Sequence, residues 1–140
     1  MESKNQANIT VIQEWIESHN RDDIDAELGF WDDKATMTIV ATGKTYSGIA
    51  ELQAAAQMAV KSHGRKTITH IFTGDDWVCA EYTAKSTVSG PMDAHGIVIP
   101  AGVVKDMELQ ICFLARIQDG KIIESREYWD TASMMRQLQA

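Results

Sequence analysis

The sequence predicts a single α+β domain spanning residues 1–140, with helices packed on one face of a strongly curved, mixed but mainly antiparallel sheet. Two observations lead to this prediction. Apolar residues recur at helical spacing in three segments of the first half, whereas the second half alternates with period two, as strands do. The expected order is helix, helix, strand, helix, four strands and a short final helix. Three helices on one face of a bent sheet form a cone, and a cone encloses a pocket.

The first two helices are indicated by an apolar stripe and by capping residues. In residues 5–19, Ile9, Ile12 and Ile16 recur at intervals of three and four. A short second helix follows, and either Asn20 or Asp22 can cap it. Acidic side chains at its start suit the positive end of a helix dipole.

Residues 35–42 are β-branched and alternating, which indicates the first strand. A third helix is expected over residues 48–63, with Ser47 as its N-cap and Gly64 as its C-terminal stop. Period-two patterns then predict strands at residues 66–73, 77–88, 103–117 and 121–129. We expect residues 89–102, which are rich in Gly and Pro, to form a long exposed or lid-like excursion, and residues 131–138 to form the last helix.

Composition and charge exclude several classes of function. The chain carries 20 Asp and Glu against 13 Lys and Arg, a net charge of −7, so it lacks the basic surface that nucleic acids or anionic membranes require. No apolar run is long enough to cross a bilayer. The first residues show no hydrophobic signal segment, and Cys79 and Cys112 suit small buried thiols better than a disulfide. We therefore expect a cytoplasmic protein.

The dipeptide Asp119-Gly120 is the strongest hairpin signal and sets a register for the last two strands. With a two-residue turn, opposed residue numbers sum to 239, so Ile117 meets Ile122, Ala115 meets Glu124, Phe113 meets Arg126, Ile111 meets Tyr128 and Leu109 meets Asp130. These residues share one face of the sheet. Six of these residues are apolar: Leu109, Ile111, Phe113, Ala115, Ile117 and Ile122. This face of the sheet is therefore the better candidate for the core.

Four polar side chains on this apolar face are therefore anomalous: Glu124, Arg126, Tyr128 and Asp130. Burial raises the pKa of a carboxyl group, which makes Asp130 a candidate general base. Asp130 equally suits the N-cap of the final helix, and the two roles are compatible. Arg126 either binds a substrate oxyanion or reaches solvent at the edge of the sheet.

The first hairpin offers a second candidate pair. Ile68, His70 and Phe72 are expected to share a face with Trp77, Cys79 and Glu81, with His70 opposite Glu81. A histidine beside a carboxylate on an aromatic face is suited to proton transfer, and a purely structural pair is the alternative.

Two tryptophans allow either a structural role or a role in binding. Trp15 and Trp31 are core residues by default, but aromatic side chains that line a cavity are also what a flat hydrophobic ligand needs. The histidines and cysteines show no metal-ligand spacing, and no glycine-rich phosphate loop occurs. We expect neither a metal nor another cofactor.

Several motifs together resemble one known family. Residues 119–124, 128–130 and 136–138 are similar to the "DGKI-x-E … D … QL" ending of SnoaL-like proteins, which belong to the nuclear transport factor 2-like superfamily. Trp15 and residues 30–33, 46–48 and 99–102 follow the order of that family, so the resemblance spans nearly the whole chain. It implies a cone of three helices against a bent sheet, an internal pocket and a homodimer.

The resemblance also implies a chemistry. Cyclases of this family use an Asp at the position of Asp130 as acid/base in a cofactor-free intramolecular aldol closure. They also carry a His on the strand before the turn, where this chain has Leu109, Ile111, Phe113 and Ala115. Related epoxide hydrolases have an ending similar to residues 126–130, but they pair it with an Arg-x-Asp that residues 81–85 lack.

The leading hypothesis is a homodimeric protein whose pocket binds a small hydrophobic, carbonyl-bearing molecule for cyclisation or isomerisation. Asp130 and His70 are its candidate catalytic residues. The candidate binding residues are Trp15, Trp31, Trp77, Glu81, Phe113, Arg126 and Tyr128. The alternatives are a non-catalytic ligand-binding or dimerisation module and an epoxide hydrolase-like enzyme.

Overall fold

The computed structural model describes residues 3–94 and 97–139. Helices α1 (Lys4–Asn20) and α2 (Ile24–Leu28) precede strands β1 (Trp31–Ile39) and β2 (Lys44–Ser47), which lead into helix α3 (Ile49–Lys61). The rest of the chain contains β3 (Arg65–Gly74), β4 (Trp77–Ser89), β5 (Met92–Ala94), β6 (Ile97–Ile99), β7 (Val104–Gln118), β8 (Lys121–Tyr128) and α4 (Thr131–Gln139). The predicted α+β class and element order are confirmed, with β2, β5 and β6 as additions.

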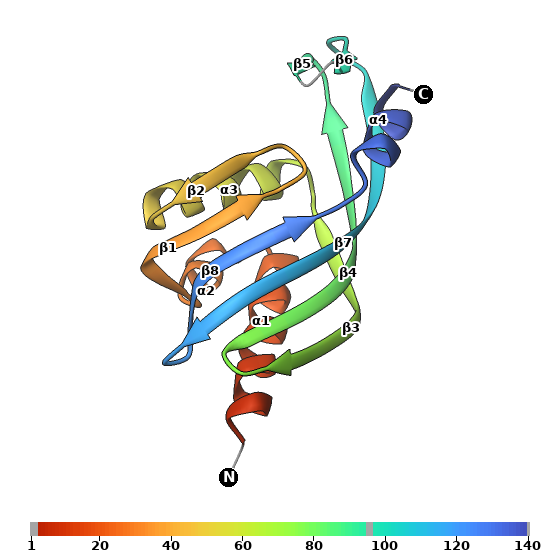
Figure 1. Cartoon of the computed structure of the whole chain (residues 1–140). Coiled ribbons are helices and arrows are strands. Elements are labelled where there is room, and N and C mark those ends of the chain that lie inside the picture. Colours follow the sequence, from red (N-terminus) through yellow and green to blue (C-terminus); the bar gives the residue numbers. More distant parts are fainter. Residues whose placement is uncertain (1–2, 95–96, 140) are drawn as a thin grey trace.

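The main sheet is mixed and strongly curved. Within the described residues it has six strands in the order β2-β1-β8-β7-β4-β3. Strand β1 runs parallel to β8, whereas the other neighbouring pairs are antiparallel. Helices α1, α2 and α3 lie on one side of this sheet, and α4 lies beside β5 and β6 at one end (Figure 1). The expected cone is therefore present.

Local hydrogen bonds place the helix ends, in part differently from the sequence prediction. The N-cap of α2 is Asp23, whose side chain accepts from the backbone N–H of Ala26, instead of Asn20 or Asp22. Ser47 does not cap α3 either, because its own N–H donates to Glu51 and Gly48 stands at the N-cap. Gly48 has φ +84, a left-handed conformation that glycine adopts without strain.

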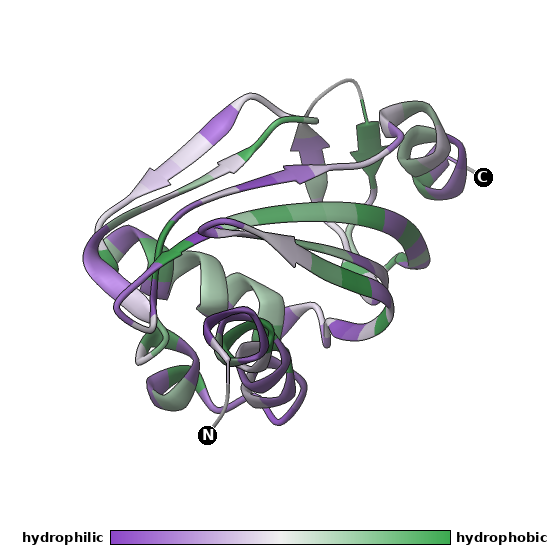
Figure 2. Cartoon of the chain, turned by 60° about the horizontal axis from the view of Figure 1, so that its bottom comes forward, coloured by the Kyte–Doolittle hydropathy of each residue, from purple (hydrophilic) through white to green (hydrophobic). Residues whose placement is uncertain are grey.

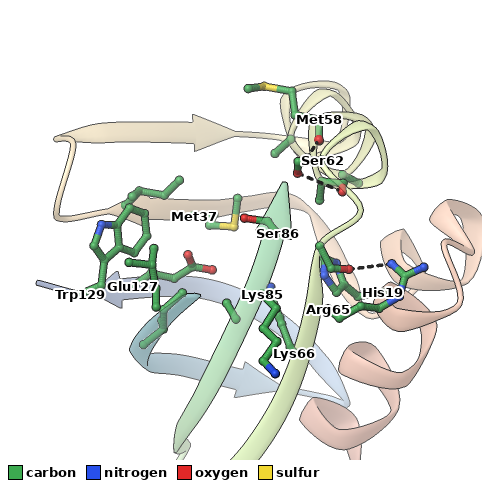
Figure 3. A pocket seen from close by; sticks show the side chains of 18 of the residues that line it. His19, Met37, Met58, Ser62, Arg65, Lys66, Lys85, Ser86, Glu127 and Trp129 are labelled. Carbon is green, nitrogen blue, oxygen red and sulfur yellow. Dashed lines mark hydrogen bonds between the residues drawn. The ribbon is translucent and has the colours of Figure 1, made fainter. Parts of the chain in front are cut away.

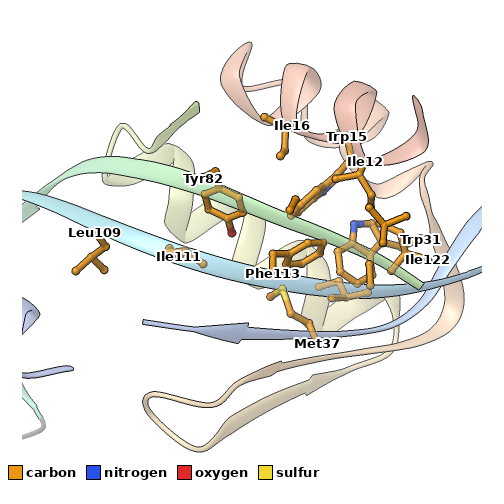
Figure 4. Packing of buried hydrophobic residues seen from close by; sticks show 14 of the residues in the cluster. Ile12, Trp15, Ile16, Trp31, Met37, Tyr82, Leu109, Ile111, Phe113 and Ile122 are labelled. Carbon is orange, nitrogen blue, oxygen red and sulfur yellow. The ribbon is translucent and has the colours of Figure 1, made fainter. Parts of the chain in front are cut away.

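The core lies between the helices and the concave face of the sheet. Trp15 of α1 stacks on Phe113 of β7 with ring centroids 4.9 Å apart, and it meets Trp31 of β1 edge-on at 5.6 Å. Ile122 of β8 is fully buried in the same cluster (Figure 4). The central strands are largely hydrophobic in Figure 2, whereas the outer side of α1 is hydrophilic. The alternation predicted for β7 is confirmed, because every second residue from Leu109 to Ile117 is buried.

A β-bulge in β8 changes the register predicted for the last hairpin. Ile117 pairs with Ile122, as the Asp119-Gly120 turn requires, but Arg116 already pairs with Glu124, so Ile123 is the extra residue. Beyond it, Phe113 faces Glu127 instead of Arg126. Because one extra residue exchanges the two faces of a strand, the predicted pairings of Glu124, Arg126, Tyr128 and Asp130 are wrong. Ser125 and Glu127 are the buried polar residues of β8.

A second bulge lies in β3. His70 pairs with Glu81 as predicted, but Ile68 pairs with Tyr82, so Thr69 is the extra residue. His70 and Phe72 therefore lie on the outer face of the sheet, whereas Ile68 packs against the core. The prediction that Ile68 shares a face with His70 is wrong for this reason.

The segment after β4 is more ordered than an exposed excursion. Strands β5 and β6 form a small hairpin whose Ile97 and Ile99 are almost fully buried. They belong to the same core cluster as Met134 and Leu138 of α4. The prediction of a lid-like loop is therefore corrected for the described part of residues 89–102, while residues 95 and 96 lie outside it. None of the helices formed by the described residues is long and apolar enough to span a membrane.

Candidate functional site

A pocket of about 290 Å³ lies between helix α3 and the concave face of the sheet. Its walls are mainly apolar: Met37 and Ile39 come from β1, Leu109 and Ile111 from β7, and alanines from α3. Ligand pockets in proteins commonly measure about 300–1,000 Å³, so this volume suits a small ligand of one or two rings. Figure 3 shows the pocket with Glu127, Trp129 and Lys66 among its lining side chains.

Glu127 is the carboxyl group that the bulge of β8 turns into this pocket. It is 7% exposed, and one of its oxygens accepts a hydrogen bond from the hydroxyl of Tyr82 at 3.3 Å. Tyr82 lies on β4 and is fully buried. Burial, together with the neighbouring Glu127, raises the pKa of Tyr82 well above its usual range. The tyrosine therefore remains a hydrogen-bond donor to Glu127 over the physiological pH range.

A histidine and a second carboxyl group meet elsewhere on the pocket wall. His19, in the last turn of α1, lies with its Nδ1 3.5 Å from Glu27 of α2, and both side chains are more than nine-tenths buried. Both residues line the pocket. A carboxylate beside Nδ1 favours the tautomer that carries its proton on that nitrogen. The sequence analysis missed this pair because the two residues belong to different helices.

Three cationic side chains also line the pocket, and they differ in their partners. Arg65 forms a two-pronged contact with Asp22, and Lys85 lies 3.9 Å from Glu108. Lys66 instead places its ammonium over aromatic rings, 4.5 Å from the centroid of Trp15 and 5.1 Å from that of Tyr82. The main chain of Lys66 is fixed by Asn20, which both donates to and accepts from it.

Of the aromatic residues predicted to bind ligand, Trp15 lines the pocket and the others do not. Phe113 and Trp31 are buried in the core beneath Trp15. Trp77 is half-buried at the far end of β4, where it pairs with Arg116. The structure therefore uses these rings mainly to pack the helices on the sheet.

The polar residues predicted on β8 lie outside the pocket. Arg126 and Tyr128 are exposed on the outer face, where Arg126 Nε donates to the tyrosine hydroxyl at 2.8 Å. Asp130 is exposed and accepts hydrogen bonds from the backbone N–H groups of Ala132 and Ser133. Asp130 thus occupies the capping position that the sequence allowed for it.

His70 and Glu81 meet as predicted, but on the outer face of the sheet. His70 Nδ1 lies 3.0 Å from Glu81 Oε1, and their side chains are 74% and 51% exposed. Hydrogen bonds from Thr69 and His70 lower the pKa of Glu81. Since neither residue lines the pocket, the structure separates this pair from Glu127.

The arrangement is suited to proton transfer on a bound small molecule. Glu127 can accept a proton, Tyr82 orients it, and the apolar walls exclude water from the reacting atoms. In the described part of the chain, no group of three or more His, Cys, Asp or Glu side chains is placed to hold a metal ion.

Comparisons with known proteins agree with this architecture. A family model described as SnoaL-like polyketide cyclase matches residues 9–138. A proposed polyketide cyclase from Xanthomonas campestris pv. campestris has a TM-score of 0.79 and 23% sequence identity, covering 97% of this chain and 99% of that chain. A proposed SnoaL-like polyketide cyclase from Shewanella denitrificans OS-217 has a TM-score of 0.81 and 15% identity, covering 94% and 96%.

IdmH from Streptomyces antibioticus, itself a proposed polyketide cyclase, has a TM-score of 0.74 and 17% identity, covering 95% of this chain and 99% of that chain. A search among curated proteins finds no match. At these levels of identity the structural similarity establishes the fold alone, because the reaction of such a protein depends on the residues of its pocket.

Proposed function

The chain belongs to the SnoaL-like polyketide cyclase family, and on that basis we propose that it binds a small hydrophobic carbonyl compound and catalyses cofactor-free acid/base chemistry on it. The observation that supports this proposal is Glu127, a carboxyl group that is buried in the wall of an apolar pocket and oriented by Tyr82. Glu127 takes the role that the sequence analysis gave to Asp130.

In the proposed reaction, the carboxylate of Glu127 removes a proton from the carbon next to the ligand carbonyl. The resulting enolate then attacks a second carbonyl of the same molecule, as in an aldol closure, or is reprotonated at another carbon, as in an isomerisation. The proton returns from Glu127 to the product. The Tyr82 hydroxyl holds the carboxyl group in one orientation throughout.

The test measures proton exchange, because it does not require the natural substrate. Wild-type protein is expected to accelerate the exchange of the α-protons of 2-tetralone for deuterium in D₂O, followed by NMR. General base catalysis contributes about 10²- to 10⁴-fold, so Glu127→Gln should lower the exchange rate by about 10²-fold or more. Asp130→Asn should leave it within about twofold, since a cap position lies outside the pocket.

The outcomes separate the candidate bases. Exchange that survives in Glu127→Gln but is lost in Asp130→Asn would restore the base predicted from the sequence. Equal exchange in wild type and both variants would refute acid/base catalysis and favour the non-catalytic ligand-binding module. The epoxide hydrolase-like alternative has less support, because Arg126 and Glu81 both lie on the outer face of the sheet.

The outer face of the sheet supports the expected homodimer. Phe72 is 62% exposed there, and Tyr128 is 37% exposed. Cys79 and Leu114 are half-buried neighbours on adjacent strands. In the described part of the chain no helix covers this face, and its apolar and aromatic side chains, set among charged ones such as Arg126, are suited to a second copy of the same face. We therefore propose that two copies pair through this surface.

A further inference from the structure

The side chain of Lys66 is half-buried on the concave side of the sheet, and its ammonium group lies over aromatic rings. Lys66 pairs with Ala84 across β3 and β4, and the bulge at Thr69 turns it to the concave face. Its Nζ lies against the rings of Trp15 and Tyr82, which are 2% and 0% exposed. Bulges commonly redirect a side chain near a functional site, so this placement calls for a reason.

Within the described residues, the Lys66 ammonium has no hydrogen-bond acceptor and no carboxylate partner. The aromatic faces attract the positive charge, but they do not accept its three N–H groups in the way that an oxygen does. Arg65 and Lys85, the other cations of the pocket wall, already have acidic partners. Among the three cations that line the pocket, Lys66 is therefore the one whose N–H groups are available to a ligand.

Lys66 and Glu127 reach the pocket from different parts of the sheet. In the sheet order, β7 and β4 separate β8, which carries Glu127, from β3, which carries Lys66. Figure 3 shows both side chains in the pocket, with apolar groups such as Met37 also lining it. A neutral ligand oxygen could accept one N–H group of the Lys66 ammonium, but an anionic oxygen also balances the charge and makes a stronger, charge-assisted hydrogen bond.

We propose that the ligand carries a carboxylate group that Lys66 binds, with its reactive carbonyl turned toward Glu127. This inference rests on the proposed function for the position of the carbonyl. A carboxylate is favoured over a phenolate because ordinary phenols, with pKa values of about 10, are protonated at neutral pH. Given the volume of about 290 Å³, the substrate class is a compact cyclic or aromatic keto acid.

The test compares two ligands of nearly the same shape that differ in charge. 2-Naphthoate carries a carboxylate where 2-acetylnaphthalene carries a neutral acetyl group, and binding of each is measured by calorimetry at pH 7. Lys66→Met keeps most of the unbranched apolar stem of the side chain and removes its charge. It should weaken 2-naphthoate binding about tenfold or more, because a hydrogen bond to a charged group is lost, and should change 2-acetylnaphthalene binding by less than about twofold.

Lys85→Met is the matched control, because Lys85 lines the same pocket but is 73% exposed and already lies near Glu108. Lys85→Met should leave the binding of both ligands unchanged. The inference is overturned if Lys66→Met weakens both ligands equally, which is the result of lost packing, or weakens neither. Lys66→Gln, with thermal unfolding of every variant, repeats the comparison should the methionine variant be unstable.

The two proposals fail in different ways. Lys66-dependent binding of 2-naphthoate by a protein that does not exchange the protons of 2-tetralone refutes the acid/base function and keeps the anion site. Glu127-dependent exchange in a protein that shows no preference for 2-naphthoate keeps the acid/base function and refutes the anion site.

Discussion

The contact between Tyr82 and Glu127 provides a quantitative test of both the site and the bulge in β8. Tyr82→Phe removes one hydroxyl, leaves no large cavity, and deprives a buried carboxyl oxygen of its donor. Hydrogen bonds to charged groups contribute about 1.5–3 kcal/mol. Since the contact of 3.3 Å is longer than the usual O–H···O distance of about 2.7–2.8 Å, we expect a loss of about 1.5 kcal/mol in the free energy of unfolding.

The assay is urea unfolding followed by tryptophan fluorescence, in a double-mutant cycle with Glu127→Met. The coupling energy should be about 1–2 kcal/mol, because each single change already removes the shared contact. Tyr128→Phe is the control, since Tyr128 is exposed and its hydroxyl accepts from Arg126, which is also exposed, a contact that should contribute at most about 0.5 kcal/mol. Additive effects, or a larger loss for Tyr128→Phe, would refute the assigned contact and favour the unbulged register.

Four further predictions concern residues away from this contact. Asp130→Ala should lower the free energy of unfolding by about 0.5–2 kcal/mol through loss of the cap on α4, measured by urea unfolding. Burial, with Cys112 beside it, raises the pKa of the Cys79 thiol from 9.0 to about 11. Iodoacetamide at pH 8, read by mass spectrometry, should therefore label it about 100-fold more slowly than a free cysteine, and rapid labelling would contradict this. Phe72→Asp should convert the proposed dimer to a monomer in light scattering, and an unchanged mass would exclude the outer face of the sheet as the interface. Thr69→Val should raise the pKa of Glu81 toward its ordinary value in an NMR titration, because the Thr69 hydroxyl is the main group that lowers it.

The fold was predictable because its strongest signals are local. The Asp119-Gly120 turn determines which strands meet, and the alternation of Leu109, Ile111 and Phe113 determines which face of β7 is buried. Strand β2 escaped prediction because it is four residues long and largely exposed, so it carries no apolar alternation. Its place at the edge of the sheet, paired with β1, is decided by contacts between strands and not by the pattern of its own residues.

The site was less predictable because it depends on two breaks in strand alternation. Regular alternation of a strand places Arg126 and Tyr128 on the inner face, whereas the bulge places Glu127 there. The sequences of β8 and β3 each contain a weak indication of a bulge. Ile122 and Ile123 are consecutive apolar residues, and Ile68 and Ile71 are three positions apart, a spacing that places them on opposite faces of a regular strand. The position of the extra residue is decided by pairing between strands, which a single strand does not encode.

The two bulges have the same consequence, and it links the fold to the proposed chemistry. Each of them turns a charged side chain, Glu127 or Lys66, from the outer face of a regular strand into the cone. Charges in such a place are costly unless they are paired, and here the compensation is partial. Glu127 has one hydroxyl donor, and Lys66 has aromatic faces without an oxygen acceptor in the described structure. A ligand carboxylate would supply the oxygen acceptor that Lys66 lacks, so binding and stability should rise together, and 2-naphthoate should raise the unfolding temperature of wild type more than that of Lys66→Met.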